Sequence, residues 1–155
     1  MDIYAKIKEL NIELPPKAKP FAAFLPAKEF GDKLLYVSGS GPVFHADGSP
    51  SYVGQVGGEI TLEQGYSAAR SCGIALLASM HYTIGDLNKV KSIVKVFGLI
   101  NSAPGFYSQP AVLNGFSDLM AEVFGEDGKH ARSAMGTSSL PFNIPVEVEM
   151  LVELK

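Results

Sequence analysis

The last stretch of the chain reads Val146-Glu-Val-Glu-Met-Leu-Val-Glu-Leu154, and its pattern is the clearest indication of the fold. Every second position is apolar: Val146, Val148, Met150, Val152 and Leu154. The alternate positions hold Glu147, Glu149, Leu151 and Glu153. Such alternation predicts a β-strand that buries one face. Its second face carries three carboxylates and one leucine, which suits solvent or an interface.

Upstream of this strand, four more segments have strand character. They are 21–27, 34–39, the long β-branched run 90–100, and a segment that opens near Arg132. Gly31-Asp32-Lys33 predicts a hairpin turn between the first two. Residues 39–58 are rich in Gly, Pro, Ser and Asp, which predicts a long loop.

Helical spacing marks three further segments. Residues 2–10 predict a short helix, followed by a proline-rich extended connector. Thr61 with Gln64 forms a capping-box signature, and an apolar stripe at helical spacing then runs to Gly85, which can end the helix. A second long helix is predicted over 110–124, and Gly125 ends it.

The predicted order α-β-β-α-β-α-β-β indicates the α+β class, with a mixed sheet and both long helices on one face. The other face then has nothing in this chain to cover it, although 34–37 and 93–97 place apolar side chains there. Burying apolar surface is worth about 25 cal/mol per Å². A large apolar patch is rarely left in water, so we expect partner chains on this face.

The composition fits one domain over 1–155, in which 1–19 form the N-terminal helix and connector. The formal charge is −3 and no Lys/Arg cluster occurs, which argues against nucleic-acid binding. The single cysteine, Cys72, excludes an intrachain disulfide and lies in an apolar helix, as a core residue would. We find no signal-peptide pattern and no apolar run that could span a membrane, so a cytoplasmic location is expected.

Familiar catalytic motifs are absent from the sequence. There is no phosphate loop, dinucleotide fingerprint or paired-cysteine metal site. His45, His81 and His130 lack ligand spacing to one another, which predicts no metal site.

The segment around Arg132 carries the sharpest chemical signal. Small or apolar residues flank Arg132, which places it at the edge of a buried surface, and we expect Glu147 to open the adjacent strand. A guanidinium there can bind a carboxylate, and a half-buried glutamate can activate water. A structural ion pair between Arg132 and Glu147 is the alternative, and periodicity alone favours it. On the same grounds Asn114 is interpreted as a surface helix residue and Ser38 as a turn hydroxyl.

Several segments together resemble the RidA/YjgF family of enamine/imine deaminases. They are Leu34-Leu-Tyr-Val-Ser-Gly39, the Val-Lys-Val strand, Val112-Leu-Asn114, Ala131-Arg-Ser133, and Leu140-Pro141 followed by Val146-Glu-Val-Glu149. The resemblance spans about residues 20–154. The N-terminal helix and the loop 101–106 resemble a longer branch of that family.

The resemblance implies a chorismate-mutase-like fold and a homotrimer with sites in clefts between subunits. It implies that Arg132 grips a substrate carboxylate, that Glu147 positions the hydrolytic water, and that Asn114, Ser38 and the backbone of Ala134 line the cleft. The implied reaction hydrolyses a reactive 2-imino acid to a 2-oxo acid and ammonia, without a metal or cofactor. The partner is then a small carboxylate-bearing metabolite.

Two positions depart from the family pattern. The first-strand tyrosine is missing from Phe24-Leu-Pro-Ala27, and Ala134 stands where a cysteine is usual. Loss of a hydroxyl and a thiol keeps two other hypotheses open. One is a trimeric protein that binds small carboxylates without turnover. The other is the endoribonuclease or translation-inhibitor activity often attached to this family, which the acidic balance disfavours.

Overall fold

The computed structural model describes residues 2–17, 19 and 22–155. Over these residues the helices and strands follow the order predicted from the sequence. The helices are α1 (Ile3–Glu9), α2 (Leu62–Ile84) and α3 (Gln109–Phe124), with short 3-10 turns η1 (Leu87–Lys89), η2 (Gly125–Gly128) and η3 (Pro141–Asn143). The strands are β1 (Ala27–Phe30), β2 (Leu34–Ser40), β3 (Val90–Asn101), β4 (Ala131–Thr137) and β5 (Val146–Leu154).

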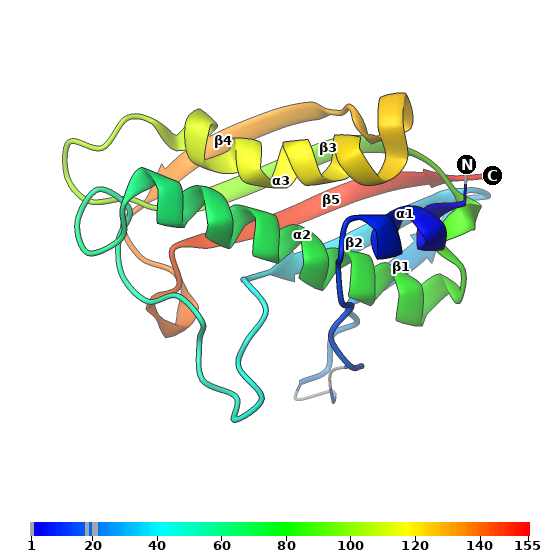
Figure 1. Cartoon of the computed structure of the whole chain (residues 1–155), viewed down its shortest axis with the longest axis horizontal. Coiled ribbons are helices and arrows are strands. Elements are labelled where there is room, and N and C mark those ends of the chain that lie inside the picture. The colour runs from blue at the N-terminus through cyan, green and yellow to red at the C-terminus, as the bar shows by residue number, and fades with distance from the viewer. Residues whose placement is uncertain (1, 18, 20–21) are drawn as a thin grey trace.

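The strands form one mixed sheet in the order β1-β2-β5-β3-β4 (Figure 1). The terminal strand β5 lies at its centre and runs antiparallel to both β2 and β3. The pair β3 and β4 is parallel, because α3 carries the chain back between them. The alternation in β5 is confirmed, since Val146, Val148, Met150, Val152 and Leu154 are all buried.

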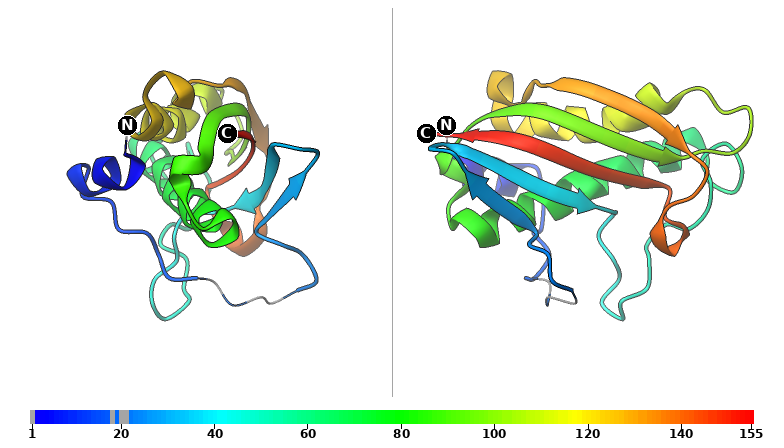
Figure 2. Two further views of the ribbon diagram at one scale, coloured as in Figure 1. Left: turned by 90° about the vertical axis from the view of Figure 1, so that its right-hand side faces the viewer. Right: turned by 180° about the vertical axis from the view of Figure 1, so that it is seen from behind.

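Both long helices begin and end where their signals predict. Thr61 Oγ1 accepts a hydrogen bond from the Gln64 amide at 3.1 Å, and Gln64 Oε1 accepts from the Thr61 amide at 2.9 Å. Gly85, with φ 77°, ends α2, and Gly125 ends α3. Figure 2 shows α2 and α3 together on one face of the sheet, as predicted.

Small residues let the two helices approach closely. A Cβ on Gly115 of α3 would lie 2.0 Å from the Tyr66 carbonyl oxygen of α2, and a Cβ on Gly73 would lie 2.6 Å from Leu119. On the sheet below, a Cβ on Gly98 would lie 2.5 Å from Leu113. These contacts fix α3 against β3 and so define the position of every side chain on the inner face of α3.

The second face of the sheet has no helix over it in the described part of the chain (Figure 2, right). Tyr36 on β2 is 44% exposed and Met135 on β4 is 54% exposed. Leu99 and Leu151 on the same face are half-buried. The predicted open sheet face is therefore present, with apolar side chains and the three glutamates of β5 on it.

The first predicted strand is placed wrongly. The strand expected over 21–27 is found at Ala27–Phe30, and residues 22–26 are irregular; Phe21 lies outside the described residues. The turn at 31–33 places Phe30 opposite Leu34, and the pairing of β1 with β2 then runs away from the turn as far as Ala27 and Val37. Pro26 has no amide hydrogen to donate, which disfavours continuation of the ladder on its far side.

Candidate functional site

Arg132 lies on β4, the edge strand beside β3. It pairs in register with Val96, a fully buried residue that faces the helices. Because paired residues in neighbouring strands point to the same face, the Arg132 side chain extends over the helix-covered side, along α3. This position agrees with the prediction that Arg132 borders a buried surface.

Three neutral oxygens on one face of α3 hold the guanidinium. Arg132 Nη1 donates to Asn114 Oδ1 at 2.9 Å and to Ser117 Oγ at 3.1 Å, and Nη2 donates to the Pro110 carbonyl at 3.3 Å. The spacing of these residues, four and then three apart, puts them on one side of the helix. Asn114 is an exposed helix residue, as the sequence suggested, and it also contacts Arg132.

The charge of Arg132 has no carboxylate partner among the residues that the structure describes. The other arginine of the chain, Arg70, pairs with Glu122 at 2.5 Å. A guanidinium has five N–H donors, and three of those of Arg132 are engaged. Among the described residues, Nε–H and one N–H of Nη2 have no hydrogen-bond partner, and the Nε/Nη2 edge of a guanidinium can bind a carboxylate in bidentate fashion.

A cavity of about 350 Å³ opens beside this guanidinium. Its lining comes from α3 and from the segment that leads into β4: Asn114, Ser117, Asp118, Ala121, Lys129, His130 and Arg132. Burial lowers the pKa of His130 from its usual 6.5, and the nearby Arg132 and Lys95 lower it further, against a raising effect of its bond to Gly128. We call this cavity the Arg132 pocket.

Glu147 lies on the opposite face of the sheet. It pairs in register with Leu99, whose neighbours Gly98 and Ile100 face the helices. Its carboxyl lies beside Gly39, where an added Cβ would be 2.6 Å from Oε1. Burial raises the pKa of Glu147 above its usual 4.5, and the neighbouring Glu149 raises it further. A half-buried carboxyl with a raised pKa is a stronger base than an exposed one.

Two sequence-based interpretations of this pair are wrong. Glu147 does not open the strand adjacent to Arg132, because β3 separates β4 from β5. Strands are spaced about 4.8 Å apart, so the two backbones lie about 10 Å apart, and their side chains leave the sheet on opposite sides. A structural Arg132–Glu147 ion pair is therefore absent within the described chain.

Ser38 and Ala134 lie outside the lining of the Arg132 pocket. Ser38 Oγ donates to the Leu25 carbonyl at 2.6 Å, as a turn hydroxyl would. Ala134 pairs with Gly98 in register and packs half-buried against the core. One chain thus brings Arg132 and Asn114 together on the helix side, and leaves Glu147 beside Gly39, next to Ser38, on the open side.

Three polar residues at these sites were missed from the sequence. Ser117 and His130 line the Arg132 pocket, and the Tyr36 hydroxyl donates to Glu149 Oε1 at 2.6 Å on the open face. Accepting that bond, Glu149 raises the pKa of Tyr36. Ser117 follows Asn114 by three residues, so helical spacing could have placed it on the same face. The pattern around His130 and Tyr36 holds no comparable signal.

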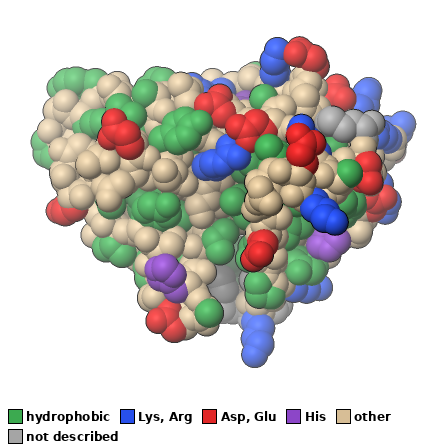
Figure 3. Space-filling view, in the orientation of Figure 1, with side chains coloured by type: hydrophobic (Ala, Val, Ile, Leu, Met, Phe, Trp, Pro, Cys, Tyr) green, Lys and Arg blue, Asp and Glu red, His purple; other side chains and the backbone are tan. Residues whose placement is uncertain are grey.

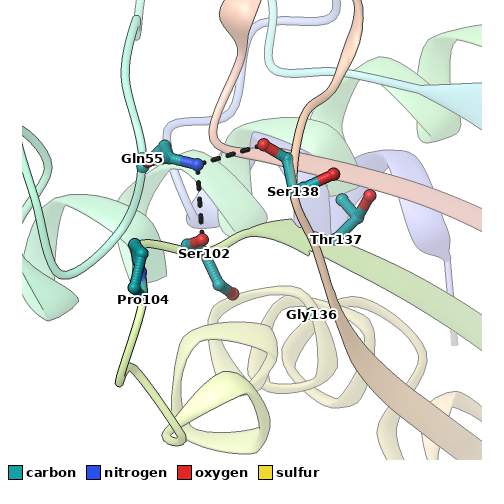
Figure 4. Close-up of a pocket in the computed structure, with 6 residues that line it drawn as sticks. All are labelled: Gln55, Ser102, Pro104, Gly136, Thr137 and Ser138. Carbon is teal, nitrogen blue, oxygen red and sulfur yellow. Dashed lines mark hydrogen bonds between the residues drawn. The ribbon is translucent and has the colours of Figure 1, made fainter.

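A second cavity, of about 410 Å³, lies where β3 and β4 end. Figure 4 shows Gln55 reaching across it, with Nε2 donating to the carbonyls of Ser102 at 3.3 Å and Ser138 at 3.1 Å. Its lining residues, Gln55, Ser102, Pro104, Gly136, Thr137 and Ser138, are uncharged. The cavity therefore lacks an acid, a base or an ion-binding group, and the Arg132 pocket is the stronger candidate site.

Within the described residues, no group of three or more His, Cys, Asp or Glu side chains is arranged to hold a metal ion. Two of the histidines have separate hydrogen-bond partners: His81 Nδ1 is bonded to the Tyr4 hydroxyl at 2.8 Å, and His130 Nε2 is bonded to Ser117 Oγ. Cys72 is fully buried, as predicted for a core residue. A search of the described helices also finds none of the length and apolarity that crossing a bilayer requires.

A family model described as "YjgF/chorismate_mutase-like, putative endoribonuclease" matches residues 5–154. The chain belongs to this YjgF family. The resemblance seen in the sequence is thereby confirmed, and the mixed α+β sheet with its helices on one face is the YjgF fold.

Three relatives match nearly the whole chain of this YjgF protein. "Protein TCP17" of Trypanosoma cruzi is 40% identical over 153 residues, covering 98% of this chain and 94% of its own. The protein Atu1372 of Agrobacterium tumefaciens, of unknown function, is 38% identical with a TM-score of 0.87, covering 98% of this chain and 91% of its own. A "putative endoribonuclease" of Shewanella oneidensis is 29% identical with a TM-score of 0.91, covering 99% and 100%.

Proposed function

We propose that this protein is a hydrolytic deaminase that converts reactive 2-imino acids to 2-oxo acids and ammonia. Water adds to C2 of the imine, the carbinolamine so formed loses ammonia, and a C2=O bond replaces the C2=N bond. The observation that carries the proposal is the state of Arg132: three neutral acceptors hold its positive charge in place, and within the described residues no carboxylate pairs with it.

Arg132 supplies binding and orientation in this scheme. A bidentate hydrogen bond to the substrate carboxylate would fix C2, which is bonded directly to that carboxylate, at a set distance from the guanidinium. Orientation of two reactants in this way can account for several kcal/mol of a barrier. Asn114 and Ser117 already hold the guanidinium in the free protein, so binding of substrate need not order the Arg132 side chain.

Glu147 supplies the base that takes a proton from the attacking water. The burial that raises its pKa makes it a better base near neutral pH than a solvated glutamate. This proton passes to the imine nitrogen to give the carbinolamine; the hydroxyl proton of the carbinolamine then moves to the same nitrogen, and the C–N bond breaks to release ammonia. The scheme uses no metal and no cofactor, and we assign it to the cytoplasm.

A second copy of the chain is required for this chemistry. Arg132 and Glu147 lie on opposite faces of one sheet, so a single chain does not present both to one substrate. The open face, which carries Glu147, Tyr36 and Met135, is the surface that a neighbouring chain would cover. We propose a homotrimer in which Arg132 of one chain meets Glu147 of the next, with Ser38 and the Ala134 backbone lining the cleft.

The test generates 2-iminobutanoate from an amino acid in situ, with semicarbazide as a trap for imine that the protein has not hydrolysed. Wild type should speed 2-oxobutanoate release, and Arg132→Ala should lower kcat/KM by at least about a hundredfold, the loss expected for a charge-assisted bidentate contact. Arg70→Ala is the matched control: it removes the other arginine, which pairs with Glu122 and is not among the residues that line the pocket, and it should retain activity.

A non-catalytic protein that binds small carboxylates in the same pocket is the second candidate. Two features outside the pocket favour it: the Ser38 hydroxyl is bonded to a backbone carbonyl, and the first strand has no tyrosine. The imine assay separates the two. Calorimetric binding of 2-oxobutanoate that Arg132→Ala abolishes, with no acceleration of imine hydrolysis by wild type, would establish the binder and reject the deaminase.

RNA cleavage is suggested by the family description and by the name of the Shewanella protein. The surface argues against it, because the formal charge is −3 and Figure 3 shows acidic and basic side chains interspersed on the helix-covered side. Phosphate neutralisation dominates RNA affinity, so RNA binding here should be weak. Salt-sensitive RNA binding or cleavage that persists in Arg132→Ala would contradict this expectation.

A further inference from the structure

The contact between Arg132 and Ser117 continues to the half-buried His130. Ser117 Oγ lies 3.1 Å from Arg132 Nη1 and 3.0 Å from His130 Nε2. On the other side of the ring, His130 Nδ1 lies 2.7 Å from the Gly128 carbonyl oxygen. The series Arg132–Ser117–His130–Gly128 is therefore a continuous line of hydrogen bonds that ends on the backbone.

The Gly128 carbonyl at one end of this series, together with a neutral imidazole ring, determines which atom donates in each hydrogen bond. A carbonyl oxygen only accepts, so His130 Nδ1 must carry the hydrogen. In a neutral ring Nε2 is then the acceptor, and the Ser117 hydroxyl donates to it. The lone pairs of Ser117 Oγ are thereby left to face Arg132, whose Nη1 can only donate.

The neutral ring is the form that the surroundings favour. His130 is half-buried, and its ring stacks edge-on against Phe116 with centroids 6.0 Å apart. The charged groups around it are Arg132 on β4, Lys95 on β3, Lys129 beside it and Asp118 on α3. Burial opposes a charged ring, and the nearby cations Arg132 and Lys95 oppose it further, so the pKa of His130 is lowered.

We propose that Ser117 and neutral His130 are positioning residues for Arg132. By presenting a hydroxyl whose hydrogen points away from the guanidinium, they hold Nη1 against α3 and so fix the position of the guanidinium at the pocket. This inference rests on the proposed function for the identity of the ligand, a small carboxylate. In this role His130 acts through Ser117, and Ser117 acts through Arg132.

Nuclear magnetic resonance can test this positioning role in the protein without any ligand. Long-range ¹H–¹⁵N spectra of the full chain at neutral pH should show His130 in the Nδ1–H form, with the signal assigned by its loss in His130→Gln. With two arginines in the chain, their Nε–H signals can be told apart with Arg70→Lys. Rotation about the Arg132 Cζ–Nη bonds should be slow in wild type and faster in Ser117→Ala.

Binding of 2-oxobutanoate by calorimetry is the second arm. Ser117→Ala should weaken the affinity about tenfold, the loss of one charged hydrogen bond. Ser117→Thr keeps the hydroxyl and should bind within about twofold of wild type. Ser67→Ala is the matched control, since Ser67 is a helical serine on α2 whose hydroxyl bonds to its own helix at the Glu63 carbonyl.

The outcomes separate this inference from the proposed function. An Nε2–H or doubly protonated ring, or unchanged Arg132 dynamics and affinity in Ser117→Ala, would overturn the positioning role. Absence of 2-oxobutanoate binding in wild type would overturn the proposed ligand, while the ring and guanidinium signals would still decide whether Ser117 and His130 hold Arg132. Equal losses in Ser117→Ala and Ser117→Thr would indicate a packing effect and would also reject the role.

Discussion

Arg132 and Glu147 point away from each other across one β-sheet, on strands β4 and β5 that are separated by β3. Arg132 is bound to α3 on the covered face, and Glu147 lies beside Gly39 on the open face. An enzyme that uses both groups on one substrate must take them from two chains. This relationship makes the proposed function dependent on assembly, and it can be tested without a structure of the complex.

Mixing two inactive variants should restore activity. Arg132→Ala and Glu147→Gln each remove one half of the proposed site, so each alone should be inactive in imine hydrolysis. If subunits are exchanged by joint refolding, about one quarter of the interfaces should pair an intact Arg132 with an intact Glu147. The measurement is the rate of 2-oxobutanoate release from the mixture.

Two results would contradict the shared site. A mixture no more active than the separate variants, with exchange shown by tagged subunits, would place both groups in one chain's site. A single-chain mass for wild type by light scattering at micromolar concentration would remove the second chain altogether.

Substitution of Gly39 should affect activity more than stability. In Gly39→Ala the new Cβ would meet Glu147 Oε1 at 2.6 Å, and the end of a flexible side chain can move aside at little cost. We expect the free energy of unfolding to change by less than about 1 kcal/mol, while the displaced carboxylate lowers kcat by tenfold or more. Urea denaturation and the imine assay measure the two effects. Gly58→Ala is the control, because the contacts of its Cβ are no closer than 3.4 Å.

The stability of Glu147→Gln should exceed that of wild type at neutral pH. The pKa of Glu147 is raised in the folded chain, mainly by burial, so ionisation of this group opposes folding. Below the usual pKa of 4.5 the Glu147 carboxyl is protonated in the folded and the unfolded chain, and wild type has its full stability. As the pH rises through the higher pKa of the folded chain, ionisation of Glu147 lowers that stability. The difference between the two proteins should therefore vanish near pH 4 and grow toward pH 7. Thermal unfolding across this range measures it, and a pH-independent difference would place Glu147 in solvent.

Gly115→Ala should destabilise the fold although alanine is the better helix former. Alanine would favour an isolated helix by about 1 kcal/mol over glycine. Here the Cβ would lie 2.0 Å from the Tyr66 carbonyl oxygen, so α2 and α3 must separate, at a cost of about 1–3 kcal/mol or more. A lower urea midpoint is the expected result. An unchanged or higher midpoint would show that the helices are not in contact at this point.

Local patterns in the sequence were sufficient for most elements. The alternation in 146–154 predicted β5 with the correct buried face, and the capping box at Thr61 predicted the start of α2. These signals are read within one turn or one strand, so they do not depend on the rest of the fold. The first strand was misplaced because its position follows from pairing with β2 through the turn at 31–33, and pairing is not a local property.

In the candidate site, too, local sequence signals identified residues but not the way in which they are brought together. Family resemblance in the sequence singled out Arg132, Asn114 and Glu147 as residues. Their relationship was not predicted, because strand order decides it: insertion of β3 between β4 and β5 separates the guanidinium from the carboxyl. Ser117 and His130 were overlooked because their link to Arg132 arises where α3 crosses back over β4.

The sequence by itself determined all the long helices and strands except the first strand, which face of β5 is buried, and that the sheet has a second apolar face without a covering helix. These follow from the periodicity of side chains along the backbone. Only the tertiary structure decided that Arg132 is held by neutral acceptors and that Glu147 faces the other way. Strand order and helix crossing bring together residues far apart in the chain, and no local period records which of them will meet.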